Sequence, residues 1–337
     1  MLIAEAGGSA SGVAIDASRF YGLLYIDRKQ DRHVNLRNSA DPIAVYAGCA
    51  SLLAASARAA GESFTVLTNA LAELRSVVEA AGFPPFDCRE MAFDLDLPPN
   101  TRFFQAHHKL CVLEALGSGD FGSFVGLVDI DAVMQAPLSK RLGRAPGIHV
   151  YAIDEGLADA RIGDLDFLIG PSEGQRRWYG GEFIAGDSVS MQRLATTCMA
   201  LLPRYLDVLP RLLHVGDEMI LSAAVNLMEQ EGAPIRDVGS ERIVARWYSS
   251  RLRVAEEPLT QALDATIVHL PTDKTFLCDQ ARQPFTVKRF RHALVRHAFG
   301  KSLVRSLVNP VLNLAKGENK YAPSVWHTRR LTSRERP

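Results

Sequence analysis

The chain has 337 residues, of which 47% are hydrophobic and 23% charged, proportions typical of a globular protein with a large core. Its five cysteines are scattered and never form a C-x-x-C pair, which argues against a disulfide framework or a zinc site and favours a reducing compartment. The N-terminal segment does not resemble a signal peptide, and no segment has the roughly 18 to 20 uninterrupted apolar residues of a membrane span. We therefore expect a cytoplasmic protein.

The formal net charge of zero conceals two oppositely charged parts. From Gln280 to the C-terminus the chain carries 13 Lys/Arg and 2 Asp/Glu, a net charge of +11, so the first 279 residues carry −11. This asymmetry predicts a body of residues 1–279 and a basic tail of residues 280–337.

The body alternates apolar strand-like runs with helical patterns. In the first half, strands are predicted at 21–26, 64–68, 87–93 and 124–131, and helices at 42–59, 70–81 and 106–116. Asp41 and Pro42 supply a helix N-cap and a first-turn proline, and Gly82 and Gly117 follow predicted helix ends. Later strands are predicted at 148–153, 182–185, 242–248 and 265–270, and helices at 188–206 and 217–228. This alternation predicts an α/β fold with a mainly parallel central sheet flanked by helices.

The most informative segment is Phe124-Val-Gly-Leu-Val-Asp-Ile-Asp131, an apolar strand that ends in two carboxylates. Asp129 and Asp131 share strand parity, so their side chains share a face while the chain is extended. Two carboxylates this close repel each other unless a cation lies between them. Mn²⁺ or Mg²⁺, held together with a substrate diphosphate, fits this donor type. The alternative is a strand end with two solvated acids.

Several further motifs occur in a characteristic order around this acidic pair. They are His108-Lys109, Asp129-Ile-Asp131, Tyr179-Gly-Gly-Glu-Phe-Ile184, Gly216-Asp-Glu218 and His269-Leu-Pro-Thr-Asp-Lys274. From about Tyr21 to Leu277 this order resembles the GT-A nucleotide-sugar glycosyltransferases, particularly relatives of the type 8 family. The sequence departs from the common type 8 ending, in which proline and tryptophan follow the lysine, because Thr275 and Phe276 follow Lys274 here.

The resemblance assigns the metal site and the cationic part of the donor site. It implies that Asp129, Asp131 and His269 bind a divalent ion, Mn²⁺ or Mg²⁺, which bridges the donor diphosphate. Lys274 would neutralise a phosphate oxygen, and Lys109 would lie near the donor. The alternatives are a hydrogen-bonded strand histidine at residue 269 and a solvated helix lysine at residue 109.

The resemblance also assigns the rest of the donor site and the acid–base candidates. Gly180 and Gly181 would line the donor-sugar pocket, where small residues let the backbone approach a ligand. Asp27, directly after the first strand, is placed in the donor site as well. Asp217 and Glu218 lie where an acid near the sugar or acceptor is expected, and one of them would be a general base in an inverting reaction. Alternatively, both acids serve only the dipole of the helix that they begin.

The basic tail contains a predicted amphipathic helix. Its apolar positions are Val287, Phe290, Leu294, Phe299, Leu303 and Leu307, and its basic positions are Lys288, Arg289, Arg291, Arg296, Lys301 and Arg305. Such a helix either packs on its own domain or lies on an anionic membrane surface. Nucleic acid is not an expected partner, because no aromatic platform or known binding motif is present.

The implied activity is a metal-dependent glycosyltransferase that moves a sugar from a nucleoside-diphosphate-sugar donor to a glycan or lipid-linked acceptor, of the surface-polysaccharide or lipopolysaccharide type. The enzyme would be cytoplasmic, with peripheral contact at the inner face of the cell membrane. One alternative is a haloacid-dehalogenase-type phosphatase with Asp129 as nucleophile and Val133 two residues after the acidic pair. Another is a catalytically silent nucleotide- or carbohydrate-binding protein on the same fold.

Overall fold

The computed structural model describes residues 18–27, 36, 41–98, 101–153, 159–171, 176–249 and 259–315, without the side chains of 159–161 and 302–315. The predicted tail positions Leu303, Arg305 and Leu307 therefore lie outside the described side chains. The chain divides into two compact units, Met1–His292 and Ala293–Pro337, and each is considered by itself.

The first unit contains a seven-stranded sheet whose strands lie in the order β3-β2-β1-β4-β7-β6-β8. The strands are β1 (Arg19–Leu24), β2 (Ser63–Thr68), β3 (Cys88–Glu90), β4 (Phe124–Val128), β6 (Ile148–Ala152), β7 (Tyr179–Asp187) and β8 (Ile235–Asp237). Four of the six pairings are parallel, and β7 runs antiparallel to both of its neighbours. The predicted α/β architecture with a mainly parallel central sheet is confirmed.

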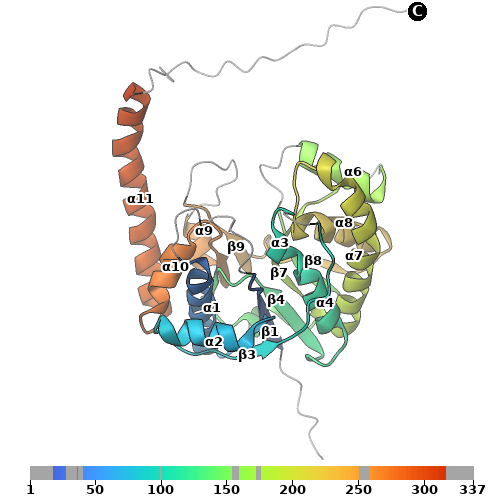
Figure 1. Cartoon of the computed structure of the whole chain (residues 1–337), viewed down its shortest axis with the longest axis horizontal. Helices are drawn as coiled ribbons and strands as arrows, with labels where there is room; N and C mark the ends of the chain where they lie inside the picture. Colours follow the sequence, from blue (N-terminus) through green and yellow to red (C-terminus); the bar gives the residue numbers. More distant parts are fainter. Residues whose placement is uncertain are drawn as a thin grey trace, which may run out of the picture. The chain divides into compact units, whose positions relative to one another are not determined.

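Helices cover both faces of this sheet (Figure 1). The helices of this unit are α1 (Pro42–Ala59), α2 (Leu71–Ala80), α3 (Phe104–His107), α4 (Lys109–Gly117), α5 (Leu138–Leu142), α6 (Asp159–Ile169), α7 (Ser188–Val208), α8 (Asp217–Gln230), α9 (Leu259–Asp264) and α10 (Lys274–Ala281), with a short 3-10 helix at Leu209–Arg211. α1 packs against α2 and α10 on one side, and α7 packs against α4, α6 and α8 on the other. The charge-based boundary after residue 279 falls within α10.

α1 begins as the sequence predicts. The Asp41 carboxylate accepts a hydrogen bond from the Ala44 N–H at 3.0 Å, and Pro42 occupies the first turn. Within the described part of the chain, α1 is the one helix long and apolar enough to cross a membrane, and most of its residues are buried in the fold like those of a core helix.

The main core lies between the sheet and α4, α7 and α8. Trp178, Tyr179 and Tyr205 are among its largest fully buried side chains. Burying a large apolar side chain contributes about 1.5–3 kcal/mol, so this layer fixes the positions of β7 and α8 firmly relative to each other.

A second, three-stranded sheet has the order β5-β10-β9 and joins segments far apart in the sequence. Its strands are β5 (Ala132–Met134), β9 (Val244–Arg246) and β10 (Ile267–His269). His269 pairs in register with Ala132 on one side and with Arg246 on the other. The small sheet therefore places Asp131, His269 and Arg246 side by side.

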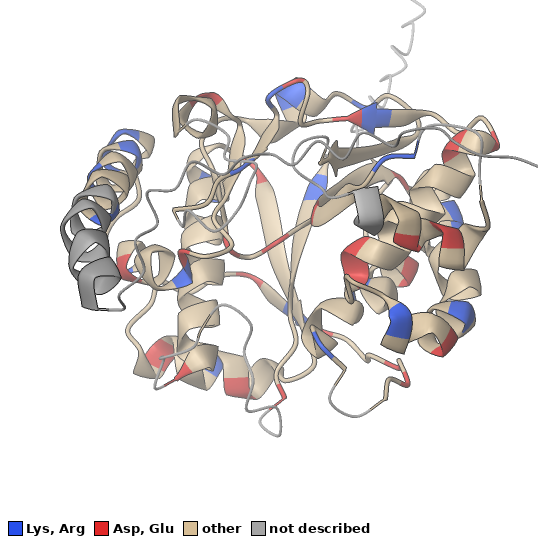
Figure 2. Ribbon diagram, turned by 90° about the horizontal axis from the view of Figure 1, so that it is seen from above, with Lys and Arg blue, Asp and Glu red and all other residues tan. Residues whose placement is uncertain are grey.

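Helix α11 (Val287–Ala315) starts in the first unit and continues into the second, and it covers the positions at which the sequence predicts the tail helix. In its first turn, Phe290 is buried near the rings of Phe276 and Phe285. Lys and Arg residues, blue in Figure 2, recur along the described part of α11.

Candidate active site

Asp129 and Asp131 lie where the chain leaves the large sheet and enters the small one. The Asp129 N–H donates to the Glu182 carbonyl on β7 at 2.9 Å, and the Leu270 N–H donates to the Asp131 carbonyl at 2.9 Å. The predicted strand 124–131 is therefore β4 followed by a crossover into β5, because its last residues change partner sheet. β4 lies beside β1, where the strand order reverses, and open α/β sheets bind ligands at that kind of edge.

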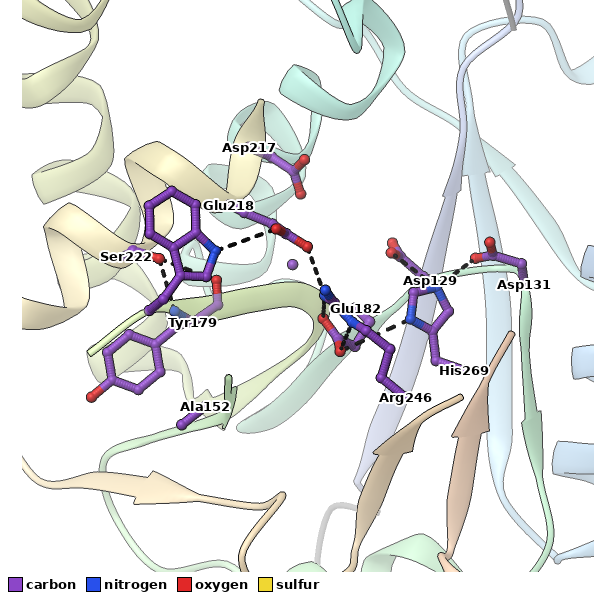
Figure 3. A network of polar contacts seen from close by, with 12 residues as sticks. Asp129, Asp131, Ala152, Tyr179, Glu182, Asp217, Glu218, Ser222, Arg246 and His269 are labelled. Carbon is purple, nitrogen blue, oxygen red and sulfur yellow. Dashed lines mark hydrogen bonds and ion pairs between the residues drawn. The ribbon is translucent and has the colours of Figure 1, made fainter. Parts of the chain in front are cut away.

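The two carboxylates converge on His269 (Figure 3). The His269 Nε2 atom lies 3.2 Å from Asp131 Oδ1 and 3.8 Å from Asp129 Oδ2. One ligand atom from each of the three residues lies within 4.8 Å of the other two. The structure thus brings together the three residues that the sequence predicts as metal ligands.

Each carboxylate also binds a buried lysine through its other oxygen. Lys109 Nζ lies 2.7 Å from Asp129 Oδ1 and 2.8 Å from Asp217 Oδ2, and it donates to the Gly181 carbonyl at 2.8 Å. Lys274 Nζ binds Asp131 Oδ2 and donates to the Pro271 carbonyl at 2.9 Å. The lysines therefore orient the carboxylates and leave one oxygen of each facing His269.

The charged groups shift one another's pKa in opposite directions. Burial raises the pKa of Asp131, but Lys274 and His269 outweigh it and hold this pKa well below its usual range. Burial raises the pKa of Asp129, and the positive charge of Lys109 lowers it. The adjacent negative charge of Asp131 raises this pKa further, so the net shift is upward. Burial would lower the pKa of Lys109, but Asp129 and Asp217 raise it above its usual value. The Lys109 ammonium group is therefore charged at neutral pH.

Arg246 organises a second group of charges on the other side of His269. Its Nε donates to Glu182 Oε1 at 2.7 Å, and its Nη2 donates to Glu182 Oε2 and, at 2.6 Å, to Glu218 Oε1. The Trp178 Nε1–H donates to Glu218 Oε2 at 3.4 Å. Burial raises the pKa of Glu218, but Arg246 outweighs it and the pKa falls to about 2.

The two predicted acid–base residues are thus both held in ion pairs, Asp217 with Lys109 and Glu218 with Arg246. A carboxylate with a pKa near 2 is a weak base at neutral pH. In this structure Glu218 acts as a counter-ion for Arg246.

The start of α8, which carries both acids, is fixed by hydrogen bonds from α3 and α7. The Gly216 N–H donates to the Tyr205 hydroxyl oxygen at 3.0 Å. The Tyr205 O–H donates to His107 Nε2 at 2.8 Å, and the His107 Nδ1–H donates to the Phe103 carbonyl at 2.9 Å. This chain of bonds holds Asp217 opposite Lys109.

Gly180 and Gly181 leave room for these ion pairs to lie against β7. A Cβ atom at Gly181 would lie 2.2 Å from Asp217 Oδ2 and 3.1 Å from Lys109 Nζ, and one at Gly180 would lie 2.0 Å from Glu182 Oε2. The predicted role of these glycines was to let a ligand approach the backbone. The structure fills the adjacent space with charged side chains of the chain itself.

Asp27 follows β1 at the same edge of the large sheet. The neighbouring Ile26 exchanges two backbone hydrogen bonds with the Asn69 side chain, at 2.8 and 2.9 Å, which joins the ends of β1 and β2. His108 is buried and stacks on Tyr25 at 3.9 Å. Burial, together with the neighbouring His107, lowers the pKa of His108 to about 4, so its ring is neutral at pH 7.

Glu182 and Arg246 are central to the site but were not predicted as functional residues. Glu182 lies inside the Tyr179-Gly-Gly-Glu-Phe motif, where an acid between apolar strand residues signals a buried charge that needs a partner. Arg246 lies in a predicted strand, and its partner is 64 residues away in the sequence. No local pattern identifies that pairing.

The residues present fit a divalent cation. Five carboxylates, those of Asp129, Asp131, Glu182, Asp217 and Glu218, surround the site with three cations, Lys109, Arg246 and Lys274, which leaves a net charge of −2 before His269 is counted. Two carboxylates and an imidazole are a donor set suited to Mn²⁺, and the carboxylates alone also suit Mg²⁺. One divalent cation would neutralise this charge.

Comparisons with known proteins give a likeness in fold. No protein-family model and no curated protein sequence matches the chain. Among solved structures, the chain is similar to a crystal structure of the galactosyltransferase LgtC in complex with donor and acceptor sugar analogues. The TM-score is 0.48 at 15% sequence identity, and the match covers 81% of this chain and 99% of that one.

Proposed function

We propose that this chain is a metal-dependent glycosyltransferase that moves a sugar from a nucleoside-diphosphate-sugar donor to a glycan or lipid-linked acceptor. The observation that carries the proposal is the convergence of Asp129, Asp131 and His269 at the carboxyl end of β4, beside two buried lysines. The order of motifs in the sequence, which resembles that of the nucleotide-sugar glycosyltransferases, supports the same activity.

The reaction requires stabilisation of the negative charge that develops on the departing nucleoside diphosphate. A divalent cation held by Asp129, Asp131 and His269 would supply Lewis-acid stabilisation of that charge. Lys109 and Lys274 add fixed positive charge beside the carboxylates, at positions set by their ion pairs. The arrangement thus serves to hold a leaving group.

The surroundings of Asp129 favour this function over nucleophilic attack in a phosphatase. Its Oδ1 atom is bound to Lys109, and its Oδ2 atom faces His269. A nucleophilic carboxylate needs one oxygen directed at the substrate phosphorus, whereas both oxygens here are directed at groups of the chain itself.

Calorimetry with a panel of nucleoside diphosphates, each with and without Mn²⁺, tests the donor site. We expect at least one nucleotide to bind in the presence of Mn²⁺, more weakly without it, and the panel then identifies the base. Absence of nucleotide binding in both conditions would contradict the proposal. Slow hydrolysis of the matching nucleotide sugar distinguishes an enzyme from a silent binding protein, which binds the donor without turnover.

We also propose that α11 contacts an anionic membrane surface, where a lipid-linked acceptor would be found, and that the protein is cytoplasmic and peripheral to the membrane. Val295 and Phe299 are 42% and 70% exposed on this helix, and the neighbouring Arg296 is exposed as well. Exposed apolar side chains among basic ones suit the interface of a membrane with anionic lipids.

Sedimentation with anionic liposomes tests this contact in the full chain. Phe299→Ser should reduce the bound fraction severalfold, because burial of an aromatic ring in the interface is lost. Val189→Ser, a change at an equally exposed apolar residue of α7, is the matched control and should leave it unchanged. Equal sedimentation of all three proteins, or equal binding to zwitterionic liposomes, would show that α11 does not recognise an anionic membrane.

A further inference from the structure

His269 has one imidazole nitrogen facing the metal cluster and the other facing a buried acid. Nε2 faces Asp129 and Asp131, while Nδ1 lies 3.9 Å from Glu182 Oε1 (Figure 3). Nδ1 is buried and, among the described residues, has no hydrogen-bond partner. A buried polar atom without a partner is costly, so this nitrogen requires an explanation.

Glu182 is held so that it can supply that partner. Its side chain is fully buried, at 0% exposure, and Arg246 binds it through both Nε and Nη2. A two-point contact of this kind fixes the orientation of the carboxylate as well as its charge. Arg246 is fixed in turn by Glu218 and by its place beside His269 in the small sheet.

The unpaired nitrogen follows from the position of the imidazole proton. A neutral imidazole carries one N–H, and when that proton is on Nε2 it is donated to Asp131 Oδ1, 3.2 Å away, and Nδ1 is left bare. A metal binds a nitrogen that carries no proton. If Nε2 is the ligand, the proton must lie on Nδ1, and an approach of about 1 Å by the ring brings Glu182 Oε1 within hydrogen-bonding distance.

We propose that Glu182, held by Arg246, accepts a hydrogen bond from the Nδ1–H of His269 when a divalent cation binds at Nε2, and thereby sets the metal affinity of the site. The inference rests on the metal site of the proposed function. Glu182 and Arg246 are positioning residues that act through His269, in the way that carboxylates beside metal-bound histidines fix the tautomer and orientation of the ring.

Titration of the metal-free protein with Mn²⁺, followed by electron paramagnetic resonance, tests whether Glu182 sets the metal affinity of the site. Glu182→Gln keeps the shape of the side chain but has a single, weaker acceptor oxygen in place of two, so it loses one of the two contacts with Arg246, and we expect Mn²⁺ affinity to fall about 10- to 100-fold. Glu241→Gln is the matched control, because Glu241 also binds an arginine, Arg236, at two points. It should bind Mn²⁺ like the wild type. Equal Mn²⁺ affinity of the wild type and Glu182→Gln would contradict the proposed role of Glu182.

Nitrogen-15 NMR of the histidine side chains tests the proton position in the wild type, so this test does not depend on whether a variant folds. His269→Gln identifies the signals of His269. We expect its proton on Nε2 in the metal-free protein and on Nδ1 in the presence of Zn²⁺, a diamagnetic cation that accepts an imidazole ligand. An Nδ1 without a proton in the metal complex would overturn the proposal. A wild type that binds neither Mn²⁺ nor Zn²⁺ would refute the metal centre itself, whereas metal binding with the proton still on Nε2 would refute only the proposed role of Glu182.

Discussion

Asp129→Asn is expected to lower Mn²⁺ affinity by at least about 100-fold, because it removes a charged ligand rather than a group that orients one. It should also abolish the Mn²⁺-dependent part of nucleotide binding. Asp129 is the better ligand to replace, because its side chain is 24% exposed whereas that of Asp131 is 7% exposed. Lys109, its buried partner, keeps Asp217 and the Gly181 carbonyl.

Mn²⁺ titration by electron paramagnetic resonance and nucleotide calorimetry measure the two effects, and thermal unfolding confirms that the variant is folded. Asp120→Asn, in an exposed loop, is the control for the same chemical change and should behave like the wild type. Wild-type Mn²⁺ affinity in Asp129→Asn would contradict the assignment of this residue as a ligand.

Lys274→Met is expected to have the largest effect on stability, a loss of about 3–5 kcal/mol in the free energy of unfolding. The substitution keeps the apolar stem of the side chain and removes the charge that compensates the buried Asp131 carboxylate. Breaking a buried ion pair is costly because the remaining charge is left without a partner. The cost should fall when Mn²⁺ is added, since a bound cation replaces part of the lost positive charge.

Urea unfolding of the full chain measures this effect. The double variant Lys274→Met with Asp131→Asn removes both charges and should recover much of the lost stability. Lys288→Met, at an exposed position in the first turn of α11, is the control and should unfold like the wild type. If the single variant is as stable as the wild type, or the double variant is less stable than the single one, Lys274 does not stabilise the buried Asp131 carboxylate.

Local signals in the sequence were sufficient to predict most of the elements. The Asp41–Pro42 start of α1 and the apolar run before Asp129 depend on neighbouring residues alone, and both features are present in the structure. The direction of β7 was not predictable in this way. A strand has the same period whether its partners run parallel or antiparallel, and β7 is antiparallel to β4 and β6.

The proximity of Asp129, Asp131 and His269 was predicted from the order of motifs, and the structure brings these residues together. The ion pairs were not predicted, because Lys109 and Asp217 are 108 residues apart, and Lys274 and Asp131 are 143 residues apart. Their pairing depends on where the two sheets meet. For the same reason, the ion pairs of Asp217 with Lys109 and of Glu218 with Arg246 could not be predicted from the sequence.

The candidate metal site is complete only when the strands of the small sheet β5-β10-β9 are paired. Its three strands are each three residues long and come from distant segments, so their pairing requires the closure of long loops. Before β10 takes its place, Asp129 and Asp131 have no histidine beside them, and Asp131 has no lysine. A chain in which β10 has not paired with β5 therefore carries the acidic pair without the coordination geometry, and cation binding and substrate recognition require that long-range pairing.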